Sequence, residues 1–377
     1  MTRTLEILEQ LVAFPTVSAQ SNLALIDYAQ NLLHRAGCTV TRIPSPCGQK
    51  AGLFARTGPE FGGVCLSAHT DVVPVTGQEW TCDPFALKRR KDRVLGRGTT
   101  DMKGFLASAL ACAERAAKRP LREALTLSIS YDEEIGCVGI RHMMPVLAPL
   151  LGSPRAVIVG EPTSMQVATG HKGKTALRVL CHGQSGHSAL APNFTNAIHL
   201  AAGFVGEMRD LQNDLAQRDT DSDYSVPYST VHIGQIAGGM ALNIVPDAAH
   251  LDMEFRYLAS QRAEALFAEI EERARQVGTQ FGNPDAIEVL QTNAYFGLDT
   301  APEAPVVSWA CELAGGTSPT KVTFGTEAGF FANMGLDTVI IGPGDMAADG
   351  HKPDEGLNLD QLGSCDAMMD SLIDDLA

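Results

Sequence analysis

The sequence predicts an α/β protein in which a small βαββαβ domain is inserted into a larger domain of alternating strands and helices. Three observations predict this organisation. Strand-like and helix-like segments alternate over residues 1–174, the order becomes strand, helix, strand, strand, helix, strand over 175–291, and alternation resumes over 292–377. We therefore expect one domain formed by 1–174 and 292–377, and an inserted domain formed by 175–291.

The elements of the larger domain follow from hydrophobic periodicity. Glu6 and Glu9 interrupt an apolar N-terminal segment, which predicts an amphipathic helix, and a second helix ends at Gly37. Apolar runs predict strands at 38–43, 51–55, 63–68, 124–131, 155–159, 320–324 and 337–341. Helices are expected at about 103–118, 137–149, 304–314, 326–333 and 358–376. Such alternation is typical of a largely parallel or mixed sheet covered on both faces.

The inserted segment has its own pattern. Its elements are expected as a strand from about residue 175, helix 193–209, strands 228–237 and 248–257, helix 261–277 and strand 286–291. This order is that of a split βαβ, ferredoxin-like sandwich. The hydrophilic loop Arg218–Tyr224 separates its first helix from its second strand.

Composition excludes several function classes. The formal charge is 29 − 44 = −15 and no Lys/Arg run is long enough to follow a phosphate backbone, which argues against nucleic-acid binding. The nine cysteines are odd in number and lack a CxxC pair, so they indicate reduced thiols rather than disulfides or a thiolate zinc site. No window approaches the apolar length of a membrane span. These features favour a cytoplasmic protein.

Histidine and carboxylate side chains recur where the strands of the larger domain end, which is where open α/β sheets bind ligands. They are His69, Asp71, Asp101, Asp132, Glu133, Glu134, Glu161 and His351. Oxygen and imidazole ligands suit zinc, manganese or cobalt. Two histidines with several carboxylates exceed what one tetrahedral ion needs, so the pattern favours a carboxylate-bridged pair of metal ions.

Taken singly, each of these residues has an ordinary explanation. A histidine and aspartate after a strand commonly form a turn, and Asp101 before a helix commonly caps it. Glu161 is also compatible with a simple strand exit, and His351 with a cap of the last helix. The conjunction favours metal binding, because independent turns have no reason to supply complementary ligands at one edge of a sheet.

The motifs around these residues resemble those of the M20 family of di-zinc peptidases and deacylases. They are HTDVVP (69–74), GRGTTDMKG (96–104), DEEIG (132–136), GEPT (160–163), GHKGK (170–174), GHSALAP (186–192) and HKPDE (351–355). GHKGK, NIVPD (243–247) and GTEAGFF (325–331) resemble the acetylornithine deacetylase branch of that family. The resemblance implies a zinc-peptidase-like α/β/α catalytic domain and an inserted domain that mediates homodimerisation.

The resemblance also implies site roles. His69, Asp101 and Glu161 would bind one metal ion, and Asp101, Glu134 and His351 the other, with Asp101 bridging two ions expected to be Zn²⁺, or else Co²⁺ or Mn²⁺. Asp71 would orient the His69 ring. The implied reaction is hydrolysis of an N-acyl-L-amino acid, N-acetyl-L-ornithine giving L-ornithine and acetate in arginine biosynthesis, by a water shared between the metals with Glu133 as general base.

The inserted domain would contribute further residues. His187 would reach the active site of the partner subunit and stabilise the oxyanion, and Asn243 and Arg256 match substrate-contacting positions. Arg256 suits the substrate α-carboxylate, although an arginine on a strand also commonly forms a surface ion pair. Glu327 is the candidate for the substrate's side-chain amine. Asp132 receives no role.

Other interpretations have weaker support. "ATGHKGKT" (168–175) is close to a phosphate-loop pattern, yet a strand pattern follows it where that motif needs a helix. "DTDSDY" (219–224) lacks the glycine and terminal glutamate of a calcium loop. A non-catalytic metal-binding protein has no use for Glu133. A deacylase of other specificity, such as succinyl-diaminopimelate desuccinylase or an aminoacylase, stays open, because "GDMAADG" (344–350) departs from the expected pattern near His351.

Overall fold

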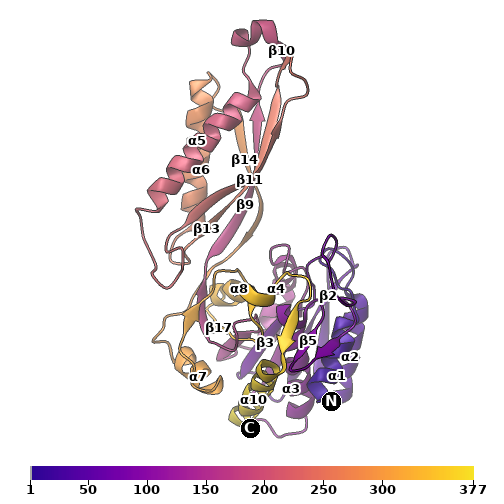
Figure 1. Cartoon of the computed structure of the whole chain (residues 1–377). Coiled ribbons are helices and arrows are strands. Elements are labelled where there is room, and N and C mark those ends of the chain that lie inside the picture. Colours follow the sequence, from indigo (N-terminus) through magenta and orange to yellow (C-terminus); the bar gives the residue numbers. More distant parts are fainter. Residues whose placement is uncertain (1) are drawn as a thin grey trace. The chain divides into compact units, whose positions relative to one another are not determined.

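The computed structural model of the protein describes residues 2–377, which divide into two compact units (Figure 1). The first unit runs to Gly170 and includes Leu298–Val322 and Thr326–Ala377. The second comprises His171–Gly297 with Thr323–Gly325. The first unit is therefore built from chain segments that lie on both sides of the second in the sequence.

A nine-stranded mixed sheet forms the centre of the first unit, which confirms the predicted fold class. Its strand order is β1 (Thr39–Pro44), β2 (Ala51–Thr57), β6 (Leu125–Ser130), β3 (Val64–His69), β7 (Ala156–Val159), β17 (Thr338–Ile340), β8 (Ala168–His171) and β15 (Leu298–Asp299), with β16 (Thr320–Lys321) paired to β8. Strands β6, β3, β7 and β17 run parallel to their neighbours in that series, and β1 and β2 are antiparallel. The four central strands therefore end at the same edge of the sheet.

Helix α3 (Gly104–Ala116) is the most deeply buried helix of this unit. Its sequence, GFLASALACAERA, is apolar on nearly every face, and its small side chains let α1 (Arg3–Val12), α2 (Leu23–Ala36) and α10 (Leu359–Leu376) pack against it. These helices and the strands share one hydrophobic core. The remaining helices are α4 (Val138–Leu151), α7 (Pro305–Leu313), α8 (Ala328–Asn333) and α9 (Met346–Asp349).

A small three-stranded sheet was not predicted. It has the order β18 (Gly356–Asn358), β5 (Arg93–Leu95), β4 (Lys88–Arg90). Each strand has only three residues, which is too short for a recognisable period. Its effect on the site is large, because the β18–β5 pairing places the segment after His351 beside the turn Thr99–Lys103 that contains Asp101.

The second unit is a four-stranded antiparallel sheet with two helices packed on it. Its elements are β9 (Gly173–His182), α5 (Ala197–Leu215), β11 (Thr230–Gly238), β13 (Ala248–Tyr257), α6 (Ala263–Gln280) and β14 (Ile287–Tyr295), with short strands β10 (Gly186–His187) and β12 (Ile244–Val245). The sheet order β11-β13-β9-β14 is that of a ferredoxin-like sandwich. The helix expected at 193–209 begins instead at Ala197, because the side chain of Asn196 caps it by accepting the N–H of Ile198 at 2.9 Å.

None of the helices within residues 2–377 combines the length and the apolarity that crossing a membrane requires.

Candidate metal centre

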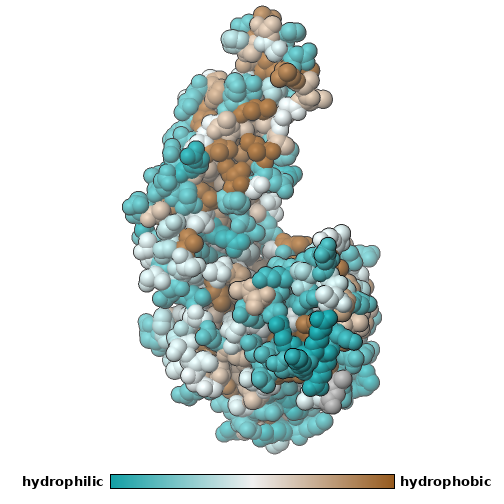
Figure 2. Space-filling model, viewed as in Figure 1, coloured by the Kyte–Doolittle hydropathy of each residue, from teal (hydrophilic) through white to brown (hydrophobic). Residues whose placement is uncertain are grey.

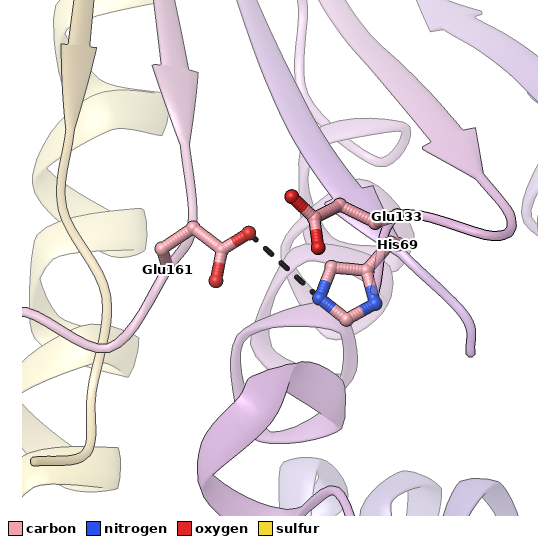
Figure 3. Close-up of side chains that lie close together, drawn as sticks. All are labelled: His69, Glu133 and Glu161. Carbon is pink, nitrogen blue, oxygen red and sulfur yellow. Dashed lines mark ion pairs between the residues drawn. The ribbon is translucent and has the colours of Figure 1, made fainter. Parts of the chain in front are cut away.

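The candidate site lies where three neighbouring parallel strands end. His69 is the last residue of β3, Glu133 follows β6, and Glu161 follows β7. Because β3 pairs with β6 on one side and β7 on the other, these side chains converge (Figure 3). One ligand atom of each lies within 4.8 Å of the others, which is close enough to surround a metal ion.

Asp101 lies between the two histidines. Its Oδ1 is 3.2 Å from His69 Nε2, and its Oδ2 is 3.2 Å from His351 Nε2. Glu161 Oε1 is 3.7 Å from His69 Nε2, and Glu134 Oε2 is 3.0 Å from His351 Nε2. The site therefore has two halves, one around each imidazole, and a single carboxylate presents one oxygen to each half.

The electrostatics of this cluster fit divalent cations. Burial, and then the nearby Asp101 carboxylate, raise the pKa of Glu134 to about 7 and the pKa of Glu161 well above its ordinary value. Glu134 Oε1 has no hydrogen-bond partner among the described residues. Hydrogen bonds to Asp101 and Glu134 raise the pKa of His351 to about 10. Buried carboxylates are costly without cationic partners, so hard oxygen donors with imidazole nitrogens suit a pair of metal ions.

The His69 ring is oriented by the residue two positions after it. Nδ1 lies 2.9 Å from the backbone oxygen of Asp71, which can only accept, so Nδ1 carries the hydrogen and Nε2 faces the carboxylates with its lone pair when the ring is neutral. The carboxylate of Asp71 has a separate task. It accepts the backbone N–H of Glu133 at 3.0 Å and of Glu134 at 3.3 Å, and so connects the histidine to the glutamate turn.

Glu355 positions Asp101, and sequence analysis assigned it no role. Its carboxylate accepts the backbone N–H groups of Gly98 (2.9 Å), Thr100 (2.9 Å) and Asp101 (3.0 Å). Arg97 Nη1 donates to it at 2.7 Å, and both side chains are 1% exposed. Glu355 is visible in the sequence as the final acidic residue of HKPDE, but the motif does not show which residues its carboxylate contacts.

Asp132 also has a clear structural task. It adopts a positive φ of 54°, and its Oδ1 accepts the N–H of Ala19 at 2.9 Å. Its Oδ2 forms a buried ion pair with Lys50 Nζ. These contacts fix the start of the turn that carries Glu133 and Glu134.

Glu327, the N-cap residue of α8, is buried with 1% exposure. Burial raises its pKa to about 7, while the nearby hydroxyl groups of Ser130 and Ser67 act in the opposite direction. It lies near enough to Glu133 to raise the pKa of that carboxyl. Its contact with a substrate amine stays a prediction.

His187, Asn243 and Arg256 all lie in the second unit. The His187 side chain is exposed, and its Nδ1 accepts the N–H of Ala189 at 3.1 Å. Asn243 is exposed, and its backbone oxygen accepts the N–H of Ser188 at 3.1 Å. Arg256 Nε donates to Glu254 at 2.9 Å, and its side chain is 33% exposed beside a cavity of about 260 Å³ within this unit.

The phosphate-loop interpretation does not hold. Residues 168–182 form strand β8 and then strand β9, so no helix N-terminus follows the lysine-containing turn.

Comparisons with known sequences identify related proteins. Residues 65–375 match the sequence model described as Peptidase family M20/M25/M40. An acetylornithine deacetylase from Myxococcus xanthus is 33% identical over 370 residues, which cover 96% of this chain and 94% of the relative. Proteins with the same name from Edwardsiella ictaluri and Salmonella paratyphi B are 31% and 32% identical, covering 96% and 94% of this chain and 95% and 92% of their own.

Solved structures of low identity share the fold. An M20 family metallo-carboxypeptidase from Sulfolobus solfataricus aligns with a TM-score of 0.80 at 19% identity, covering 99% of both chains. The aminopeptidase PepT from Bacillus cereus aligns with a TM-score of 0.78 at 19% identity, covering 99% of this chain and 98% of its own. A dinuclear metal binding peptidase of the M20 family from Bacillus subtilis aligns at 0.70 and 16% identity, with coverage of 99% and 98%.

Proposed function

This chain belongs to peptidase family M20/M25/M40, and we propose that it is a metal-dependent amidohydrolase that cleaves N-acetyl-L-ornithine to L-ornithine and acetate. The observation that carries the hydrolase proposal is Asp101, whose two oxygens each lie 3.2 Å from a different histidine nitrogen. This is the arrangement that a carboxylate shared by two metal ions requires. The substrate proposal is supported by relatives named acetylornithine deacetylase at 31–33% identity.

We assign His69, Asp101 and Glu161 to one cation and Asp101, Glu134 and His351 to the other. Zinc is the proposed metal because imidazole nitrogen and carboxylate oxygen suit it, and cobalt and manganese are the alternatives. Two such cations, when bound, supply a water of lowered pKa and polarise the acyl carbonyl.

Glu133 is the proposed general base. Its carboxyl is buried, and in the metal-free protein that burial together with nearby carboxylates raises its pKa well above the ordinary value. Two cations bound beside it would favour the ionised form, and a buried carboxylate there would accept a proton from water and pass it to the nitrogen of the leaving amine. Asp71 holds the backbone of Glu133 in place by accepting its N–H.

His187 is proposed to act in the active site of a partner subunit of a homodimer, where an imidazole N–H would stabilise the oxyanion. Two features of the second unit support an interface there. Strand β11 is an edge strand of its sheet, and large apolar side chains near it are exposed, with Ile236 at 55%, Met240 at 93% and Leu242 at 101%. Figure 2 shows hydrophobic residues gathered on the face of this unit that is in view.

Arg256 is proposed to bind the substrate α-carboxylate, since a guanidinium fork matches carboxylate geometry. Asn243 is proposed to contact the substrate, and Glu327 its side-chain amine. Their supporting observations are the cavity beside Arg256, the exposure of Asn243 and the buried charge of Glu327. Cytoplasmic location stays a prediction.

The decisive experiment compares kcat/KM of the zinc-loaded protein for N-acetyl-L-ornithine, N-succinyl-diaminopimelate and N-acetyl-L-methionine. We expect N-acetyl-L-ornithine to be the best substrate. If it were the poorest of the three, the substrate proposal would fail in favour of a deacylase of other specificity. No turnover of any N-acyl amino acid by metal-loaded protein would support the non-catalytic alternative.

A further inference from the structure

The segment between α1 and α2 contacts three of the loops that carry candidate metal ligands and the base, namely those of His69, Asp101 and Glu134. We call residues 14–19 the N-terminal clasp. It lies outside the part of the chain that matches the family model, which begins at residue 65. Lys103 Nζ donates to the backbone oxygen of Phe14 at 2.8 Å, which connects the clasp to the loop of Asp101.

The clasp pairs with the chain that follows His69. Val72 N donates to Thr16 O and Ser18 N donates to Val72 O, both at 3.0 Å, in a short parallel bridge centred on Val17 and Val72. The Thr16 hydroxyl donates to the backbone oxygen of Thr70 at 2.6 Å. These bonds fix the register of the clasp against the loop of His69 and Asp71.

Ser18 makes the contact closest to the reaction. Its hydroxyl donates to Asp71 Oδ2 at 2.7 Å. That same oxygen accepts the N–H of Glu134, and the other oxygen accepts the N–H of Glu133. Hydrogen bonds from a hydroxyl to a carboxylate are short and strong, so Ser18 sets the rotation of the carboxylate that aligns both glutamates.

The neighbouring residue fixes the other end of the glutamate turn. Ala19 N donates to Asp132 Oδ1 at 2.9 Å, and the second oxygen of Asp132 is paired with Lys50 in a site where both side chains are less than a tenth exposed. The clasp therefore contacts the turn 132–134 from two directions, once through Asp71 and once through Asp132.

We propose that the N-terminal clasp is a positioning element of the metal centre and that Ser18 is a positioning residue for Glu133 and Glu134, acting through Asp71. The catalytic part of this inference rests on the proposed hydrolase function, and the geometric part does not. Loss of residues that orient ligands typically costs 10- to 100-fold in activity or metal affinity.

Three variants test the proposal: Ser18→Ala removes the hydroxyl, Ser18→Thr retains it, and Ser21→Ala is a matched control. Ser21 is an exposed serine of the same segment whose hydroxyl contacts the N–H of Leu23. Amide hydrogen exchange of residues 131–136 in metal-free protein is the first measurement. We expect exchange at Glu133 and Glu134 to be about fivefold faster or more in Ser18→Ala, and unchanged in Ser18→Thr and Ser21→Ala.

The second measurement is steady-state kinetics at saturating metal. We expect kcat of Ser18→Ala to fall about tenfold with KM within a factor of two, and Ser18→Thr to recover most of it. Unchanged exchange in Ser18→Ala, or equal damage in Ser21→Ala, overturns the inference. Hydrogen exchange is measured without substrate. If the wild-type protein shows no turnover, the proposed function fails, and the exchange result alone still tests the positioning role of the clasp.

Discussion

The carboxylate of Glu355 accepts the backbone N–H of Asp101 at 3.0 Å, although 254 positions separate the two residues in the sequence. It also accepts the N–H of Thr100 at 2.9 Å and is paired with the buried Arg97. The segment after His351, a proposed ligand, therefore holds the loop of Asp101, the proposed bridging carboxylate. With the N–H of Gly98 counted as well, removing this carboxylate would leave three backbone donors and a guanidinium buried without their acceptor.

Glu355→Ala should accordingly destabilise the protein by about 3–5 kcal/mol, the usual effect of removing one partner of a buried ion pair. Urea unfolding measures this change. Glu123→Ala is the matched control, because Glu123 pairs with Arg155 at the surface and such pairs are worth about 0–1 kcal/mol. Equal losses of unfolding free energy in the two variants would show that Glu355 contributes no more to stability than a surface ion pair does.

Substitutions of the two adjacent glutamates, Glu133 and Glu134, should impair different properties of the protein. Glu133→Gln should retain both metal ions and lose about 10²–10⁴-fold in kcat, because it removes a proton acceptor and no assigned ligand. Glu134→Gln should weaken metal retention, because its Oε2 faces His351 at 3.0 Å. Metal content after dialysis, measured beside kcat, separates the roles. Near wild-type kcat in Glu133→Gln would refute its assignment as the base.

Metal affinity should rise with pH. In the metal-free protein hydrogen bonds to Asp101 and Glu134 raise the pKa of His351 from 6.5 to about 10, so the bound proton stabilises the fold fully below pH 6.5 and this stabilisation is lost as pH rises through about 10. A metal ion must displace that proton, and below pH 7 the Glu134 proton as well. Zinc competition titrations from pH 6 to 9 should show progressively tighter binding. A flat profile would mean that His351 is not a ligand.

Arg256→Lys should raise KM by about 10- to 100-fold with a smaller change in kcat, because a charged hydrogen bond worth about 1.5–3 kcal/mol is lost with the planar fork. Arg178→Lys provides the control, since Arg178 forms a two-bond pair with Asp252 in the same sheet and is half exposed. If both variants kept wild-type KM, Arg256 would be a surface ion pair only.

Subunit mixing tests the proposed dimer and His187 together. His187→Ala and Glu133→Gln should each be nearly inactive alone. A mixed dimer should regain one competent site, formed by Glu133 of one chain and His187 of the other. Activity that stays at the level of the separate variants after subunit exchange would place His187 outside the partner's active site.

Much of this protein could be predicted from local sequence pattern. The alternation of strands and helices predicted the mixed sheet, and the strand, helix, strand, strand, helix, strand order predicted the sandwich of the second unit. His69, Glu133 and Glu161 were predicted to converge because parallel neighbouring strands end at one edge. Helix α5 starts four residues later than the expected residue 193. The N-cap hydrogen bonds of the Asn196 side chain determine where the helix begins, and the apolar pattern before it does not.

The sequence by itself therefore determined which chemistry the strand ends carry, since side-chain type and hydrophobic period are local properties. Only the tertiary structure decided what holds those groups in place. The contacts of Ser18 with Asp71, Lys50 with Asp132 and Glu355 with the Asp101 loop join segments 53, 82 and 254 positions apart. Serine, lysine and glutamate at such positions look like ordinary surface residues in a sequence, because a hydrogen bond depends on distance and direction in space and leaves no period along the chain.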